Sequence, residues 1–215
     1  FARLTALHVA PHFEVRAYDP ALAPGAAVDE RGVTVASLEQ AAGADAVIFA
    51  TPVERLEEAI IAASPHLRAG ALVMDVGSVK VLPANIMLQH LPKTVDIVGA
   101  HPLFGPQSAK HGIRGLKIAL CPLRGERASC VESFLRDALG LDVFITTPEQ
   151  HDREAATVQG LTHLIAKVMV QMEPLPVDLT TKSYDKLHEA IEMVRYDPPE
   201  VFDAIERLNP YSAEV

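Results

Sequence analysis

Short apolar runs alternate with helix-like segments over the first two thirds of the chain. The runs are rich in Val, Ile and Ala, and each is short enough for a strand with two apolar faces. They lie at residues 14–18, 46–50, 71–75, 95–100, 117–121 and 142–146. Helical patterns separate several of them, at residues 53–63, 81–90 and 126–139. This alternation predicts an α/β domain in which helices cover both faces of a parallel sheet.

The pattern changes at Thr147, where Thr147-Pro148-Glu149-Gln150 is typical of a helix start with Thr as N-cap and Pro at the first position. The helix is expected to run to about Glu173. Helical patterning resumes after residue 178, is interrupted at residues 198–199, and is followed by no strand pattern. We therefore predict an α/β domain over residues 1–147 and a smaller all-helical domain over residues 148–215.

Composition narrows the classes of function. With 215 residues, 49% hydrophobic and 22% charged, the chain has ordinary globular usage, and its net charge of −9 argues against nucleic acid as a partner. No apolar run is long enough for a membrane helix, and no basic-then-apolar leader precedes the first run. Two cysteines are too few for a disulfide framework. We expect a cytoplasmic protein with no metal, membrane or nucleic-acid partner.

The first predicted strand is followed by an acid, in Glu14-Val15-Arg16-Ala17-Tyr18-Asp19-Pro20. In dinucleotide-binding folds such an acid accepts hydrogen bonds from the adenosine ribose of NAD and repels a 2′-phosphate. Asp19 therefore favours NAD, and its alternative role is to begin the Asp-Pro turn. The chain opens as if inside a helix, and it contains no GxGxxG. We expect the first strand and glycine loop to be absent from this sequence, the alternative being a protein that binds no dinucleotide.

Two further strand ends carry groups suited to a ligand, because open α/β sheets bind ligands beyond the carboxyl ends of their strands. Thr51-Pro52 follows one strand and Val76-Gly77-Ser78 follows the next. Gly77 allows close approach of the backbone, and the Ser78 hydroxyl can donate or accept a hydrogen bond. Ser78 has an alternative role as the N-cap of the helix that follows.

A histidine follows the next strand in Gly99-Ala100-His101-Pro102-Leu103-Phe104-Gly105-Pro106. Prolines and glycines make this loop tight, and His101 can exchange a proton near neutral pH. Its alternative is a histidine held by backbone groups at a strand end. On the helix after Thr147, spacings of seven and four place Asp152, Gln159 and His163 on one face. That polar stripe predicts either a lined pocket between the two domains or a solvated helix face.

Four motifs together resemble the prephenate/arogenate dehydrogenase family, with the order and approximate spacing of its short arogenate-type members. They are DVGSVK at residues 75–80, GAHPLFGP at 99–106, EQHD at 149–152 and VQGLTH at 158–163. The resemblance implies a Rossmann-type NAD-binding domain followed by a helical domain that pairs two subunits. It also implies oxidative decarboxylation of arogenate or prephenate in tyrosine synthesis, with NADP as an alternative cofactor.

The resemblance assigns roles to individual residues. His101 matches the catalytic histidine that accepts the ring-hydroxyl proton, and Ser78 matches the serine that orients it near the nicotinamide. His163 matches a substrate-binding histidine. The remaining expected contacts to substrate are Gln107, Ser108, Lys110 and Thr162, and those to the cofactor are Asp19, Thr51, Pro52, Val76, Gly77 and Ser78.

Thr162 departs from the family pattern, because many prephenate-specific members have arginine at that position. Loss of a guanidinium removes bidentate recognition of a carboxylate, so we expect arogenate to be used at least as well as prephenate. Two alternatives stay open. One is a related NAD-dependent hydroxyacid dehydrogenase that would use Lys167 as proton donor. The other is a non-catalytic nucleotide-binding dimer.

Overall fold

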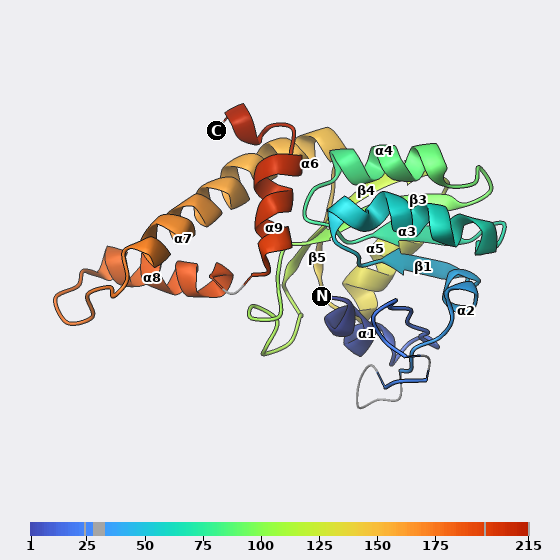
Figure 1. Cartoon of the computed structure of the whole chain (residues 1–215), viewed down its shortest axis with the longest axis horizontal. Helices are drawn as coiled ribbons and strands as arrows, with labels where there is room; N and C mark the ends of the chain where they lie inside the picture. Colours follow the sequence, from blue (N-terminus) through green and yellow to red (C-terminus); the bar gives the residue numbers. More distant parts are fainter. Residues whose placement is uncertain (24, 28–32, 196, 215) are drawn as a thin grey trace.

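Five strands form one sheet in the order β1-β2-β3-β4-β5 (Figure 1). The computed structural model describes residues 1–23, 25–27, 33–195 and 197–214. The strands are β1 (Ala46–Phe49), β2 (Leu72–Asp75), β3 (Asp96–Pro102), β4 (Lys117–Arg124) and β5 (Asp142–Ile145). Each corresponds to one of the predicted apolar runs, so the pattern located these five strands to within a few residues.

The strand directions differ from the prediction at one place. The pairs β1–β2, β2–β3 and β4–β5 are parallel as predicted, but β3 and β4 are antiparallel. A parallel return needs a crossover, usually a helix, that carries the chain back to the start of the sheet. Residues 103–116 contain no helix, so the chain re-enters the sheet from the end at which it left.

The prediction of a strand at residues 14–18 is wrong. Within it, Ala17 makes an isolated parallel bridge to Val35, and no ladder forms. A strand needs an adjacent extended partner to pair its backbone groups, and the described residues give this segment one bridge partner.

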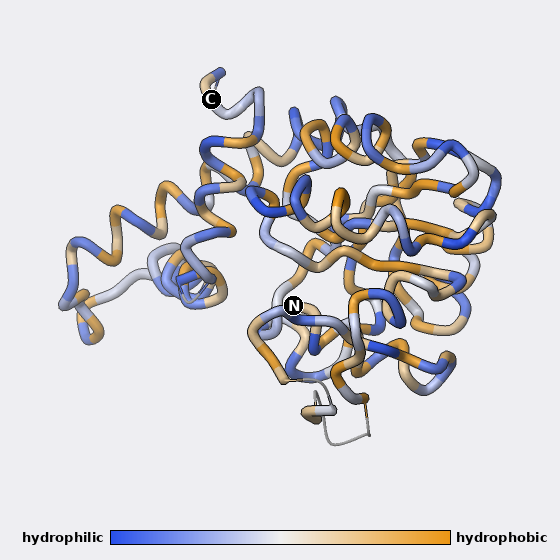
Figure 2. The backbone as a smooth tube through the Cα atoms, turned by 45° about the vertical axis from the view of Figure 1, so that its right-hand side comes forward, coloured by the Kyte–Doolittle hydropathy of each residue, from blue (hydrophilic) through white to orange (hydrophobic). Residues whose placement is uncertain are grey.

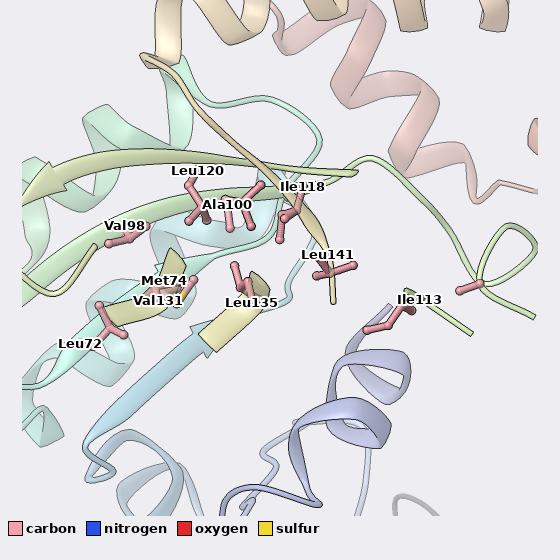
Figure 3. Close-up of a cluster of buried hydrophobic side chains, with 12 residues drawn as sticks. Leu72, Met74, Val98, Ala100, Ile113, Ile118, Leu120, Val131, Leu135 and Leu141 are labelled. Atoms are coloured by element: carbon pink, nitrogen blue, oxygen red, sulfur yellow. The ribbon is translucent and has the colours of Figure 1, made fainter. Parts of the chain in front are cut away.

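Helices cover both faces of the sheet because adjacent strand residues point to opposite sides. Val73 faces α2 (Leu38–Ala42), α3 (Leu56–Ala63) and α4 (Val81–His90), with Ile60 and Met87 in the same buried cluster. Its neighbour Met74 faces the opposite way, into a cluster with Val131 of α5 (Ala128–Ser133) (Figure 3). A π-helical turn, Phe134–Ala138, follows α5, and α1 (Ala2–Val9) lies on the same face.

Every element after β5 in the described part of the chain is helical, as predicted. These are α6 (Pro148–Ala155), a π-helical turn (Ala156–Gly160), α7 (Leu161–Gln171), α8 (Lys182–Val194), α9 (Pro199–Asp203), another π-helical turn (Ala204–Leu208) and a short 3-10 helix (Ser212–Glu214). The expected cap is confirmed, since the Thr147 side chain accepts from the Gln150 N–H. Helices α7 and α8 extend away from the sheet as an arm (Figure 1). None of the helices in the described ranges is both long and apolar enough to span a membrane.

Candidate active site

The carboxyl ends of β1, β2 and β3 lie side by side because the three strands are parallel. Phe49 pairs with Asp75, and Asp75 pairs with Gly99. The segments just beyond these residues therefore meet at one edge of the sheet. They are the ones singled out from the sequence: Thr51-Pro52, Val76-Gly77-Ser78 and His101.

The turn after β2 is tightly packed. A side chain at Gly77 would come within 3.0 Å of a Val53 methyl group and 3.2 Å of the Asp75 carboxylate. The Gly77 N–H donates to that carboxylate at 2.9 Å. A larger residue here would be crowded by these neighbouring side chains, and the turn leaves Ser78 half-buried at the sheet edge.

The cap of α4 comes from a residue far away in sequence. Helix α4 begins at Val81, so Ser78 lies too early to cap it, and that alternative is wrong. Instead, the Asp152 carboxylate accepts from the Lys80 N–H at 2.7 Å and from the Val81 N–H at 2.9 Å. Asp152 has an exposed fraction of 0%. The polar stripe of the α6–α7 region is therefore buried at this point, and a solvated face is excluded.

His101 bonds to a second histidine. The ring is 4% exposed, and its Nδ1 lies 2.8 Å from Nε2 of His151. Nδ1 of His151 lies 2.7 Å from the Asp152 carboxylate. Burial holds the pKa of His101 well below its ordinary value, and the nearby Lys80 ammonium group lowers it further. His101 is thus neutral at physiological pH, with a side-chain partner in place of the backbone groups that the alternative required.

A buried ion pair lies under the same loop. The Lys80 ammonium group pairs with the Asp75 carboxylate and donates to the Ala100 carbonyl at 2.7 Å, directly before His101. Burial raises the pKa of Asp75, and the adjacent ammonium opposes that rise. The pair ties the end of β2 to the end of β3, so it fixes the backbone that carries His101.

His163 lies beside an acid that sequence reasoning did not find. Its ring is buried, with Nε2 3.8 Å from the Asp197 carboxylate. A Cβ at Gly105, in the loop after His101, would lie 3.8 Å from the same carboxylate. Burial lowers the pKa of His163 and raises that of Asp197. Within the described residues, His163 Nδ1 and Gln159 Oε1 are buried without hydrogen-bond partners, and such orphaned atoms point to a ligand.

Several predicted residues lie apart from this cluster or are otherwise engaged. Gln107, Ser108 and Lys110 are exposed in the loop after β3. The Thr162 hydroxyl donates to the Val158 carbonyl of its own helix at 2.7 Å. The exposed Asp19 carboxylate accepts from the Ala21 N–H at 2.9 Å, which is the turn that was its alternative role.

The strand ends fit the nicotinamide half of a dinucleotide. Three parallel strands end together, and the Gly77 turn brings backbone atoms to that edge. The chain's sequence has no glycine-rich turn to hold a pyrophosphate. Asp152 was predicted on the polar stripe, but its role as the cap of α4 was not. Among the missed residues, His151 lies in the EQHD motif, whereas Asp75, Lys80 and Asp197 carry no local signal of their roles.

This sheet, with its helices on both faces and its histidine at the strand ends, defines a Rossmann-like nucleotide-binding α/β protein. The family model of the nucleotide-binding domain of prephenate dehydrogenase matches residues 17–140, and the chain belongs to that family. The match covers strands β1 to β4 and the His101 loop, while β5, His151, Asp152 and His163 lie beyond it.

Curated relatives extend the similarity into the helical part. A probable arogenate/prephenate dehydrogenase of Methanocaldococcus jannaschii is 29% identical over 190 residues, covering 83% of this chain and 42% of that protein. Arogenate dehydrogenase 1, chloroplastic, of Arabidopsis thaliana is 33% identical over 181 residues, covering 80% of this chain and 28% of that protein. The chain thus spans less than half the length of these relatives.

Solved structures share the fold. Prephenate dehydrogenase from Aquifex aeolicus, in complex with hydroxyphenyl propionate and NAD+, superposes with a TM-score of 0.64 at 23% identity, over 83% of this chain and 66% of that one. Arogenate dehydrogenase from Synechocystis gives a TM-score of 0.58 at 21% identity, over 82% and 67% of the two chains. These likenesses support the Rossmann-like architecture.

Proposed function

We propose that the protein carries out NAD-dependent oxidative decarboxylation of arogenate, with prephenate as a second substrate. The observation that carries the proposal is His101, a buried neutral base at the carboxyl ends of parallel strands, in a member of this dehydrogenase family. The names of the curated relatives support both substrates. Hydroxyphenyl propionate, bound by the Aquifex aeolicus enzyme, resembles the aromatic product of such a reaction.

The chemistry follows from the position of the base. His101 takes the proton of the ring hydroxyl as a hydride leaves the same ring carbon. Loss of carbon dioxide then returns an electron pair to the ring, which becomes aromatic. The phenolate oxygen takes back the proton held by His101, so the base is regenerated. We assign Ser78, at the adjacent strand end, the role of orienting the hydroxyl and His101.

Oxidised NAD would supply the hydride acceptor when bound at this edge. Its nicotinamide half would lie against Thr51, Pro52 and the Val76-Gly77-Ser78 turn. Asp19 is the proposed partner of the adenosine ribose, and its negative charge favours NAD over NADP. NADP stays an alternative, and it is named for a Schizosaccharomyces pombe relative.

The proposed preference for arogenate rests on Asp197. Arogenate carries an ammonium group on its side chain, whereas prephenate carries a ketone. A half-buried carboxylate beside His163 and the His101 loop can bind an ammonium group, and this pairing offsets the burial that raises the pKa of Asp197. Thr162 adds no cation that would favour the keto acid.

No observation favours the related hydroxyacid dehydrogenase. That alternative needs Lys167 as a proton donor, but the Lys167 ammonium donates to both carboxylate oxygens of Glu206 at 2.6 Å. The non-catalytic nucleotide-binding dimer makes a different prediction in the assay that follows, namely NAD binding without turnover.

The test is NADH formation with arogenate and prephenate supplied separately. It uses the chain alone and the chain with a strand and GxGxxG turn fused ahead of Phe1, because the sequence contains no such turn. We expect turnover of arogenate by the fused protein, with tyrosine and carbon dioxide as products. NAD binding without turnover of either substrate would refute the proposal.

Activity should persist well into the acidic range. The base must be neutral, and the depressed pKa of His101 moves its protonation below the ordinary histidine value of about 6.5. We therefore expect kcat/KM for arogenate to stay flat from about pH 8 down through about pH 6.5, and to fall only below that. A pH–rate profile in constant ionic strength checks this. An acid limb centred above the ordinary value would contradict it.

We also propose a homodimer formed through α7. Large apolar side chains lie exposed along one stripe of this helix and the turn before it, where hydrophobic positions recur in Figure 2. They are Val158, Leu161, Leu164, Val168 and Met172. Monomeric proteins rarely expose a contiguous apolar surface of this kind. A second copy of the arm would cover it.

Leu164→Glu should convert the dimer to a monomer, because Leu164 is 57% exposed at the middle of the stripe and a charge there cannot be buried in an apolar interface. Light scattering after size-exclusion chromatography measures the mass. Ser129→Glu adds the same charge on the exposed surface of α5 and should leave the mass unchanged. A wild-type chain that is monomeric at micromolar concentration would contradict the proposed dimer.

Cytoplasmic location stays part of the proposal. Both cysteines are free thiols, with Cys121 buried and Cys130 exposed. Burial raises the pKa of Cys121 to about 12, so this thiol is unreactive. An exposed free thiol at Cys130 suits a reducing compartment.

A further inference from the structure

Beyond the proton transfer to His101, the structure contains a chain of buried polar groups that leads away from the base. It runs from His101 to His151 and on to Asp152. His151 is 6% exposed and Asp152 is 0% exposed. No step of the proposed reaction touches either residue, and buried polar groups of this kind need a reason to be retained.

The donor and the acceptor of each hydrogen bond can be assigned by starting from the Asp152 carboxylate. A carboxylate only accepts, so His151 must carry a proton on Nδ1 to bond to Asp152. Two backbone N–H groups at the N-terminus of α4 also donate to the Asp152 carboxylate, so its charge is stabilised without a cationic partner. A neutral His151 then has a lone pair on Nε2. His101 must donate its Nδ1 proton to that lone pair, 2.8 Å away.

We propose that His151 and Asp152 are positioning residues that fix the tautomer of His101, leaving its Nε2 as a free proton acceptor. Within the described residues, Nε2 of His101 has no hydrogen-bond partner, so it is available to a substrate hydroxyl. A neutral histidine without such a partner favours the opposite tautomer, with its proton on Nε2, which could not act as the base. The catalytic consequence of this inference rests on the proposed function, whereas the tautomer of His101 is independent of it.

The same chain links the base to the turn at the cofactor edge. The oxygen of Asp152 that accepts from His151 also accepts from the Lys80 N–H, two residues after Ser78. From the other side, the Asn209 side chain donates to the Asp152 carbonyl at 2.7 Å. The orientation of His101 and the position of the Ser78 turn are therefore set by one carboxylate.

The test reads the tautomer directly by ¹⁵N NMR of the histidine rings in the full chain without substrate. His101→Asn identifies the His101 signals by their loss. We expect wild-type His101 to carry its proton on Nδ1. His151→Leu removes the acceptor, and the proton should shift to Nε2. His151→Gln places a carbonyl oxygen near the position of Nε2 and should keep the wild-type tautomer. His66→Gln, at an exposed site, should change nothing.

Asp152→Asn tests the far end of the chain. An amide oxygen accepts fewer hydrogen bonds than a carboxylate, so His151 should lose its fixed Nδ1 proton and His101 should become a mixture of tautomers. In the fused protein with arogenate, His151→Leu should lower kcat about 100-fold with little change in KM, and His151→Gln should recover most of it.

The outcomes separate the two proposals. A wild-type His101 with its proton on Nε2, or a tautomer unaffected by His151→Leu, overturns the positioning role, whatever the activity. The expected tautomers in a protein that turns over neither substrate would refute the dehydrogenase and leave the positioning role standing. Equal kcat in the Leu and Gln variants would also count against positioning.

Discussion

His101→Asn should lower kcat with arogenate by about 1,000-fold while leaving the fold and NAD binding intact. The asparagine amide can still donate to His151, so the buried hydrogen-bonded chain keeps a partner. What is lost is the ring nitrogen that accepts the hydroxyl proton, and general-base catalysis contributes about 10² to 10⁴ in rate. Steady-state NADH formation measures the loss, and KM should change little.

Two controls make this result specific. His66→Gln alters an exposed histidine in the 3-10 turn after α3 and should retain full activity. NAD affinity, measured by fluorescence or calorimetry on the fused protein, should be equal in wild type and His101→Asn. A variant that keeps more than about a tenth of wild-type kcat would exclude His101 as the base.

Asp197→Asn should reverse the preference between the two substrates. The amide has the shape of the carboxylate but cannot form the charge-assisted hydrogen bond to an ammonium group. Such bonds contribute about 1.5–3 kcal/mol, so kcat/KM for arogenate should fall about 10- to 100-fold. Prephenate, which has no ammonium group, should be used as well or better because a half-buried negative charge no longer faces it.

The ratio of kcat/KM for the two substrates is the measurement. Asp178→Asn, a charge removal at an exposed position, is the matched control and should leave the ratio unchanged. If Asp197→Asn lowers activity equally with both substrates, Asp197 supports the fold of the loop and does not read the substrate side chain.

Most of the sheet could be predicted from local patterns, because a buried strand is apolar over its own few residues. Helix α4 was predicted at its observed bounds for the same reason. The direction of a strand, in contrast, cannot be predicted from its own apolar run. The antiparallel return of β4 depends on residues 103–116 lacking a helix, and the apolar run of the strand itself is the same in either direction.

In the candidate site, too, local patterns predicted some residues and missed others. His101 and Ser78 were visible because each lies in a tight turn directly after an apolar run. Ser78 was an alternative cap for α4 because side-chain caps are usually local, whereas the structure uses Asp152, which is remote in the chain. Asp197 carried no signal, since its role comes from its position near His163 and Gly105, which no spacing rule connects to it.

The contact between Asp152 and α4 also limits how freely the two halves of such a chain can be exchanged. In a chimera joined at residue 147, a foreign helical half packed on α4 would cover the Lys80 and Val81 N–H groups and leave them without acceptors. Each would cost about 1–3 kcal/mol, and the base would lose its ring partner as well. Recombination with another helical half would succeed only where the incoming helix brings a His-Asp pair at the same place. Shuffling of these parts, in evolution or in the laboratory, would be constrained less by the loop that joins them than by this one carboxylate.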